Sequence, residues 1–158
     1  MPLRSDWSGH SCPIARSLDV VGDPWVLLVL REALEGLTRF EQFRSTLGCA
    51  DNVLSRRLSG MVEAGLLVRS TYESGNRARE EYLLTEAGTD LLPLLNALAL
   101  WGERHLPADT GRMEIVHETC GATTTSADTC SACGEPLSSV NTSWRLPRTP
   151  GSLTPLAR

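Results

Sequence analysis

The sequence predicts an α+β fold in which a mainly helical domain is followed by a small β appendage. Residues that start and stop helices alternate through positions 1–106, and two β-like runs lie in the same stretch. After Leu106 the large apolar residues become fewer, and cysteine, threonine and serine dominate. We therefore expect domains at 1–106 and 107–145, with residues 146–158 forming a flexible tail.

The composition is that of a soluble globular protein, with 41% hydrophobic and 22% charged residues. The chain shows neither a membrane-spanning apolar run nor a signal peptide, so we expect a cytoplasmic location and no membrane partner. In that compartment cysteines serve as metal ligands or reactive thiols more often than as disulfides. The formal net charge of −4 means that any surface for nucleic acid must be local.

Four helices are expected first, because a proline or polar residue precedes or begins each one and a glycine follows it. Thr38 and Glu41 have the spacing of a capping box at the start of the third helix. The expected helices span 13–21, 24–34, 39–47 and 51–64.

Two β-like runs, 66–72 and 79–84, follow the helices. The loop between them contains Gly75 and Asn76, which tolerate the positive backbone angles of a hairpin turn. Helix, helix, helix-turn-helix and a two-stranded hairpin is the order of a winged helix-turn-helix domain, with the hairpin as the wing.

A long helix is expected after the wing, from Glu86 to about His105, with Thr85 as its cap. Apolar residues recur on one face of this helix over several turns, which is more than a small domain needs for its own core. We expect this face to form a homodimer. Its residues are Leu91, Leu94, Leu95, Leu98 and Trp101.

The second helix of a helix-turn-helix lies in the major groove, because only that groove is wide enough and displays a full base code. Leu54, Leu58 and Met61 recur at helical spacing and should form the buried face of helix 51–64. The residues left facing outward carry amide, hydroxyl and guanidinium groups, which hydrogen-bond bases or phosphates. They are Asn52, Ser55, Arg56 and Ser59.

Further arginines are expected at the DNA backbone: Arg39 and Arg44 from the preceding helix, and Arg77 and Arg79 from the wing. The alternative is that each arginine merely solvates the surface, as single charges commonly do. Taken together, these residues favour DNA binding, because a polar helix face without acidic residues is followed by a basic hairpin. Glu80 and Glu81 dilute the charge of the wing, so binding should depend on two copies acting together.

Short motifs between Cys12 and His105 occur in a characteristic order. They are Cys12-Pro13-Ile14, Leu18-Asp19-Val20-Val21-Gly22, Trp25, Arg31-Glu32, Gly36-Leu37-Thr38-Arg39-Phe40, Val53-Leu54-Ser55-Arg56-Arg57-Leu58, Glu63-Ala64-Gly65-Leu66, Tyr82-Leu83-Leu84-Thr85-Glu86-Ala87-Gly88 and Trp101-Gly102. This stretch resembles the HxlR family, a branch of the MarR-like winged-helix regulators. The resemblance implies a dimeric DNA-binding regulator whose dimer contacts come from its terminal helices. The chain departs from the family at Cys49 and Ala50, where an isoleucine and a serine are usual, and its wing lacks an expected proline.

Two ligand pairs in the appendage have the spacing of zinc knuckles. His117 and Cys120 are separated by two residues, as are Cys130 and Cys133, and a glycine follows each pair. Three thiolates and one imidazole form an ordinary structural zinc set, and four ligands leave no open position for catalysis. The alternative is a metal-free β appendage whose cysteines are incidental or form a thiol pair. Short strands are expected around the site at 113–116 and 136–140.

Cys12 stands at the start of the first helix, where the helix dipole favours a thiolate. Several members of the family that the chain resembles sense oxidants or electrophiles with a cysteine near this point, so Cys12 is a candidate redox sensor. The alternative is a capping or interface cysteine without chemical consequence.

Together these patterns predict a homodimeric transcription regulator that binds a palindromic operator in double-stranded DNA and contains one structural zinc ion per chain. A redox or small-molecule response remains open, and no effector is assigned. The first alternative is a winged-helix module for protein contacts, with the zinc-stabilised tail as its docking surface. The second, a metalloenzyme, is disfavoured because the metal site is closed and no nucleophile motif is present, so we expect no enzymatic activity.

Overall fold

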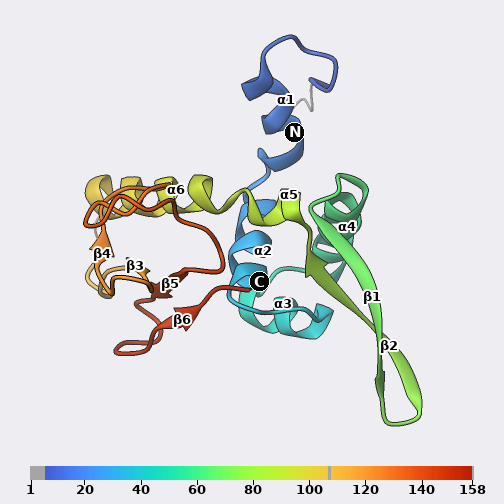
Figure 1. The fold of residues 1–158 in the computed structure, drawn as a ribbon. Coiled ribbons are helices and arrows are strands. Elements are labelled where there is room, and N and C mark those ends of the chain that lie inside the picture. Colours follow the sequence, from blue (N-terminus) through green and yellow to red (C-terminus); the bar gives the residue numbers. More distant parts are fainter. Residues whose placement is uncertain (1–5, 107, 158) are drawn as a thin grey trace.

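The computed structural model of the chain describes residues 6–106 and 108–157. Its first part is a winged helix-turn-helix domain, in which α1 and the β1–β2 hairpin project from a compact body (Figure 1). The elements of this part are α1 (Pro13–Val21), α2 (Pro24–Leu34), α3 (Phe40–Leu47), α4 (Asp51–Glu63), β1 (Leu67–Ser74), β2 (Arg77–Leu84), α5 (Glu86–Thr89) and α6 (Leu92–His105). The expected α+β winged-helix fold is confirmed.

The helix-turn-helix starts from well-defined helix ends. At α2, the Asp23 carboxylate accepts a hydrogen bond from the Trp25 N–H at 2.9 Å, and Pro24 occupies the first turn. The same carboxylate forms an ion pair with Arg57 of α4 at 2.5 Å, which ties α4 to α2. Ala50 precedes α4 and offers no capping side chain. The acidic Asp51 in the first turn instead stabilises this helix end through its interaction with the helix dipole.

Helix α3 begins one residue later than the capping-box pattern predicts. The Gln42 side-chain oxygen accepts hydrogen bonds from the backbone N–H groups of Thr38 and Arg39, at 3.1 and 3.0 Å. Glu41 instead forms an ion pair with Arg44 at 3.4 Å. Gln42 therefore satisfies these two backbone donors, and the expected Thr38–Glu41 capping box does not form.

The prediction of one long helix from Glu86 to His105 is wrong, because the helix breaks at Asp90 and Leu91. Pro93 explains the break: it has no N–H for a helical bond, and its ring would clash with the carbonyl of Thr89 in a continuous helix. Proline is tolerated in a first turn, and α6 restarts with Pro93 there. The shorter α6 is also displaced from the wing by the turn between the two helices (Figure 1).

Residues 108–157 form one unit, which we call the C-terminal module. It contains a four-stranded antiparallel sheet in the order β4-β3-β5-β6. Its strands are β3 (Glu114–His117), β4 (Thr123–Thr124), β5 (Thr142–Arg145) and β6 (Thr154–Pro155). The strand expected at 113–116 is present as β3, whereas 136–140 is mainly a loop, and the strand follows it as β5.

The two parts share one hydrophobic core. Buried residues of the winged-helix part continue without a break into Ile115, Trp144 and Leu156 of the C-terminal module. Helix α6 lies along the module (Figure 1), and a cavity of about 140 Å³ separates the start of α6 from residues 137–139. In the part of the chain that the structure describes, no helix is both long and apolar enough to cross a membrane.

Residues 146–157 make more contacts than a loosely held tail would. Leu146 and Leu156 are buried, and the Ala157 N–H donates to the Leu34 carbonyl of α2 at 2.6 Å. The Arg148 guanidinium bonds both oxygens of the Glu32 carboxylate, at 3.0 and 2.9 Å, and also contacts Glu35. The composition of this segment predicts a flexible tail, but in the structure a few apolar residues and one arginine hold it against α2.

Candidate DNA-binding surface and metal centre

Helix α4 presents the polar face that its periodicity predicts. Leu54, Leu58 and Met61 are buried, at 1, 0 and 1% exposure. Asn52, Ser55 and Arg56 are exposed on the opposite side, and Ser59 is half-buried. The first three side chains are therefore free to reach base edges in a major groove.

Ser59 is engaged by a wing residue that sequence reasoning missed. The Arg69 guanidinium of β1 donates to the Ser59 hydroxyl at 3.1 Å and lies 6.0 Å from the centre of the Tyr82 ring. Arg69 pairs with Tyr82 across the hairpin, so the register of the wing positions the cation beside the recognition helix. Only this cross-strand register reveals the contact, and the linear sequence does not contain it.

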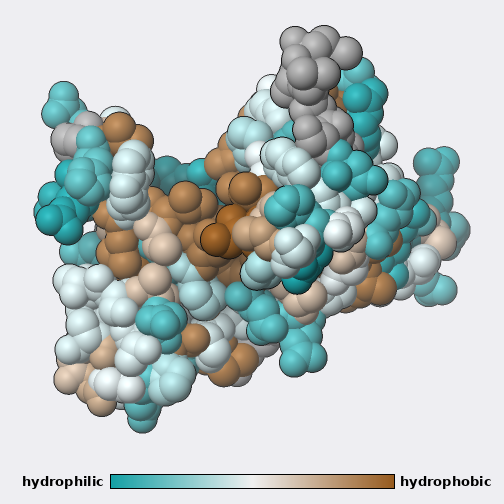
Figure 2. Space-filling view, turned by 90° about the horizontal axis from the view of Figure 1, so that it is seen from above, coloured by the Kyte–Doolittle hydropathy of each residue, from teal (hydrophilic) through white to brown (hydrophobic). Residues whose placement is uncertain are grey.

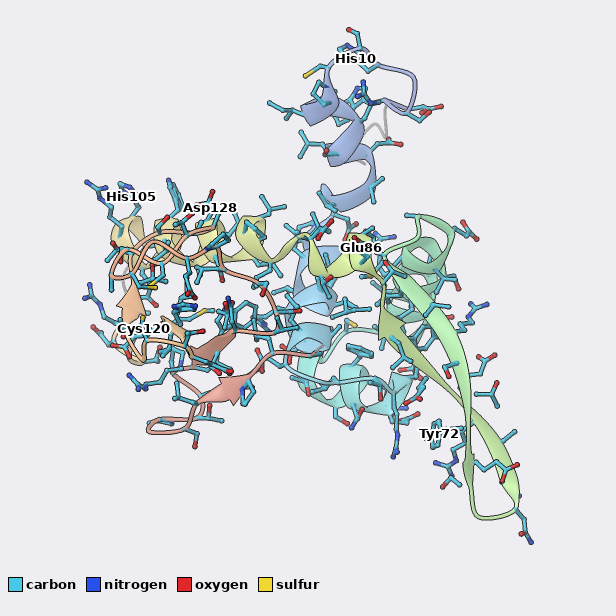
Figure 3. The ribbon with its side chains drawn as sticks, viewed as in Figure 1. His10, Tyr72, Glu86, His105, Cys120 and Asp128 are labelled. Carbon is cyan, nitrogen blue, oxygen red and sulfur yellow. The ribbon has the colours of Figure 1, made fainter. Side chains whose placement is uncertain are left out.

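A second wing contact orients Arg39, which was predicted to touch the DNA backbone. Its guanidinium carbon lies 4.5 Å from the centre of the Tyr72 ring, a cation–π contact. Tyr72 lies opposite Arg79 in the hairpin, and Arg77 lies two residues further on the same face. The structure thus brings Arg39, Arg77 and Arg79 to one side of the wing, and Figure 3 shows Tyr72 there.

Arg44 is the predicted DNA-binding residue with the most local partners. It pairs with Glu41 at 3.4 Å and with Asp51 at 3.5 Å. All three side chains are solvent-exposed, so these ion pairs are weak and can be exchanged for a phosphate.

The C-terminal module brings together the four predicted metal ligands, which we call the Cys/His cluster: His117, Cys120, Cys130 and Cys133. Their ligand atoms all lie within 4.8 Å of one another. His117 Nδ1 is 3.3 Å from the sulfurs of both Cys120 and Cys133, and the Cys120 and Cys130 sulfurs are 3.7 Å apart. Zinc–sulfur bonds of about 2.3 Å would separate two sulfurs of a tetrahedral site by about 3.8 Å. The cluster therefore has the dimensions of a tetrahedral zinc site.

Two glycines shape the loops that carry the ligands. Gly121 and Gly134 have φ angles of 71° and 80°, which residues other than glycine rarely adopt. Their N–H groups donate to the carbonyls of His117 and Cys130 at 2.8 and 2.9 Å, closing a tight turn around each ligand pair. This is the turn that the two knuckle-like motifs predict.

The loops also favour a thiolate. Hydrogen bonds from the backbone N–H groups of Cys133 and Ala132 lower the pKa of Cys130 to about 6, although burial opposes them. The Glu135 N–H favours the Cys133 thiolate, but burial and the two neighbouring thiols outweigh it and raise the pKa of Cys133. Metal binding requires deprotonated cysteines, so the backbone N–H groups that favour the Cys130 thiolate also favour its use as a metal ligand.

His117 presents its other nitrogen to a carboxylate. The imidazole is fully buried, and its Nε2 lies 3.3 Å from a carboxylate oxygen of Glu135, outside hydrogen-bond geometry. Metal-binding histidines usually direct the second ring nitrogen to a carboxylate or a carbonyl. A small movement of Glu135 would complete this arrangement.

One polar side chain of α6 connects the winged-helix part to the C-terminal module. Asn96 is fully buried, its Oδ1 accepts from Trp144 Nε1 at 3.0 Å, and its Nδ2 donates to the Ala127 carbonyl at 2.9 Å. Both halves of the amide are thus satisfied by the module. Sequence reasoning missed this residue, because an asparagine in an apolar helix does not reveal its partners.

Helix α6 keeps an apolar face that the C-terminal module does not cover. Leu94, Leu98 and Trp101, which we call the open face of α6, are 39, 46 and 57% exposed. Ile14 and Leu18 of α1 are exposed as well. Figure 2 shows apolar residues gathered in the hollow between α1 and the C-terminal module. Of the five residues expected on this face, Leu95 is buried in the hydrophobic core and Leu91 is half-buried against it.

Cys12 precedes α1 as its N-cap residue, as predicted, and is half-buried. Its backbone N–H donates to His10 Nδ1 at 3.1 Å, while its side chain makes no capping bond.

The chain matches the model of the family described as HxlR-like helix-turn-helix over residues 20–110. An uncharacterised HTH-type transcriptional regulator of Mycobacterium tuberculosis is 41% identical over 129 residues, which cover 81% of each chain. A regulator of the same description from Synechocystis is 34% identical over 104 residues, covering 65% of this chain and 76% of the relative.

Solved structures of the same fold also resemble the chain. PA1607, a proposed transcription factor, superposes with a TM-score of 0.71 and 41% identity over 84% of this chain and 93% of its own. The redox regulator HypR in its reduced form has a TM-score of 0.54 and 28% identity, over 60% of this chain and 96% of its own. The match to PA1607 spans more residues than positions 1–106 contain, so the likeness extends into the C-terminal module.

Proposed function

Because the chain belongs to the HxlR-like helix-turn-helix family, we propose that it is a sequence-specific, homodimeric regulator of transcription that binds a palindromic operator. The observation that carries this proposal is the exposed polar face of α4 beside a wing whose arginines share one side. Asn52, Ser55 and Arg56 read bases, and Arg39, Arg44, Arg77 and Arg79 contact phosphates. Ser59 acts together with Arg69, which its hydroxyl contacts.

Two copies are needed because one α4 covers only one half-site. The open face of α6 and the exposed apolar residues of α1 support a symmetric interface between copies. A two-fold dimer presents two recognition helices to two inverted half-sites, which makes the operator palindromic.

Selection of bound genomic fragments by the purified protein, followed by gel-shift titration at two salt concentrations, tests DNA binding. We expect sequence-specific complexes whose affinity falls steeply with salt, because arginine–phosphate contacts release counterions. Failure to select any fragment would favour the alternative of a module for protein contacts, with the C-terminal module as its docking surface.

The Cys/His cluster is proposed to hold one structural zinc ion per chain. Three thiols and an imidazole with tetrahedral spacing fit zinc, and four protein ligands close its coordination. The strands around the cluster have only two to four residues each, so metal binding would add to the stability that the buried Ile115 and Trp144 give this region. Elemental analysis of protein purified without a chelator or a metal-affinity tag is expected to find about one zinc per chain. A content below about 0.2 would exclude a closed structural site.

Cys12 is the proposed redox-sensing residue. Its place at the start of α1 supports this role, as does the similarity of the chain to HypR, which is described as a redox regulator. A thiol at this position adjoins the α1 surface that the proposed dimer uses, so its oxidation can alter the interface.

A further inference from the structure

Asn96 links the C-terminal module to α6, the helix that carries the proposed dimer surface. It is one of the few fully buried polar side chains among the described residues, and both of its hydrogen bonds go to the module. If the module moved away, the amide would lose both protein partners. The position of α6 therefore depends on the folded state of the module.

Both partners of Asn96 are positioned by the segments that hold the Cys/His cluster. Trp144 lies on β5, which pairs with β3 so that Trp144 faces Ile115 and Thr142 faces His117. Ala127 lies in the loop that runs from Cys120 to Cys130 and joins the two ligand pairs. An ion that draws these ligands together fixes the donor and the acceptor that hold Asn96.

The same helix offers its other side to a second copy of the chain. Asn96 lies between Leu94 and Leu98 in sequence, but its side chain is buried while theirs are exposed. Helix α6 thus contacts the C-terminal module on one side and carries the open face on the other (Figures 1 and 2). An order–disorder change in the module can reach the proposed dimer interface through a single element.

The cluster is also accessible to metal ions in solution. Cys120 and Cys133 are exposed, whereas Cys130 and His117 are buried. Two exposed ligands allow an ion to be exchanged or removed without opening the helical core. Figure 3 places Cys120 on the opposite side of the molecule from Tyr72 of the wing, so the ion cannot act by touching DNA beside the wing.

We propose that the Cys/His cluster is the effector site of this regulator: a thiophilic divalent ion bound there holds α6 through Asn96 and thereby raises the affinity for DNA. The proposal rests on the proposed function, since it requires a DNA-binding dimer and a metal-binding cluster. It goes further in making the ion a regulatory ligand, with metal occupancy and DNA binding coupled reciprocally.

The test compares full-length protein loaded with zinc and protein stripped by a chelator, titrated onto genomic fragments selected by each form. We expect removal of zinc to weaken DNA binding by about tenfold or more, within the usual range of allosteric coupling. The dissociation constant of the dimer should rise in parallel, and hydrogen exchange should accelerate more in the C-terminal module and α6 than in α3 and α4.

Four variants separate coupling from metal binding. Asn96→Leu should still bind one zinc, but the ratio of its DNA affinities with and without zinc should shrink to below about threefold, as expected when coupling is lost. Trp144→Phe, which removes only one of the two bonds to Asn96, should show an intermediate ratio. Cys133→Ser should lose the response to zinc, whereas Cys49→Ser, the same substitution outside the cluster, should behave as wild type.

The outcomes distinguish this proposal from those on which it rests. If wild-type protein binds zinc and DNA but its DNA affinity changes less than about twofold on zinc removal, the coupling is refuted and the regulator and the structural site stand. Equal zinc responses in Asn96→Leu and wild type would refute the route through α6. Absence of zinc binding overturns the metal site, and absence of DNA binding by both forms overturns the proposed function.

Discussion

Among individual residues, Arg56 is the exposed side chain best placed for base recognition, because its neighbours Leu54 and Leu58 are buried on the other face of α4. Replacing Arg56 by alanine should weaken operator binding by about 1–3 kcal/mol and relax the preference at one base pair in each half-site. Competition titrations against single-base operator variants measure both effects.

Arg79→Ala provides the matched comparison, since Arg79 lies on the wing opposite Tyr72. We expect it to weaken all sequences similarly and to reduce the salt dependence of binding by about one counterion. Unchanged base preference in Arg56→Ala would mean that α4 is oriented differently in the groove.

Cys12 leads to the second prediction at this scale. Oxidant should change the DNA affinity of wild-type protein, reductant should restore it, and Cys12→Ser should not respond. The reason is that Cys12 stands at the N-cap of α1, beside an exposed apolar surface, and at a distance in sequence from the Cys/His cluster. Gel shifts should be performed with zinc-loaded protein and with zinc content measured after oxidation. A response that persists in Cys12→Ser would assign the redox chemistry to the cluster.

At the scale of elements, an ion-pair group joins α2 to the segment that follows β5. Burial raises the pKa of Glu32, but hydrogen bonds from Arg148 and Arg31 outweigh it, so its pKa lies below the ordinary 4.5. Burial and the neighbouring Glu32 raise the pKa of Glu35, so ionised Glu35 opposes folding as pH rises above 4.5. The stabilisation by Glu32 is present above pH 4.5 and is lost as pH falls through its lower, folded-state pKa.

Arg148→Met should therefore lower the free energy of unfolding at neutral pH by about 1–3 kcal/mol, because a buried carboxylate loses one of its two cations. The difference from wild type should shrink as pH falls below 4.5 and through the lowered folded-state pKa of Glu32, where this carboxyl group becomes protonated in wild type also. Urea unfolding across this pH range measures it. Arg112→Met is the control, since Arg112 is 76% exposed and lies 3.7 Å from its partner Glu103. A pH-independent loss in Arg148→Met would indicate packing by the arginine stem instead.

Elements defined by local signals could be predicted from the sequence, whereas those defined by packing could not. Helix periodicity predicted the buried face of α4, and ligand spacing predicted the Cys/His cluster, because both patterns lie within short stretches. The apolar stripe alone does not reveal the break before α6, which depends on Pro93 lying in the first turn of a new helix. The roles of Arg69 and Asn96 depend on strand register and on a docked module, which no local pattern contains.

At the scale of the whole molecule, the open face of α6 predicts the assembly. Light scattering at micromolar concentration should give about twice the chain mass of 17.2 kDa. Leu98→Asp should shift the protein to monomers, because a carboxylate would be buried without a partner in the interface. Leu98 is 46% exposed in the single chain, so the variant should remain folded.

Leu153→Asp is the matched control, since Leu153 is 47% exposed and directly precedes β6, which lies on the side of the C-terminal module far from α6 (Figure 1). It should stay dimeric. A wild-type protein that is monomeric at this concentration would contradict the dimer and the palindromic operator together.

The bond between Ala157 and Leu34, and the pairing of Arg148 with Glu32, have a consequence for how the protein is made. The ribosome synthesises α2 more than a hundred residues before the segment that covers it. Domains usually fold from their N-terminal end during synthesis, at about 5–20 residues per second. Here Glu32 lacks its Arg148 partner until that segment has left the exit tunnel. The nascent winged helix is therefore incomplete until residues 146–157 have emerged, and it acquires its final stability only then.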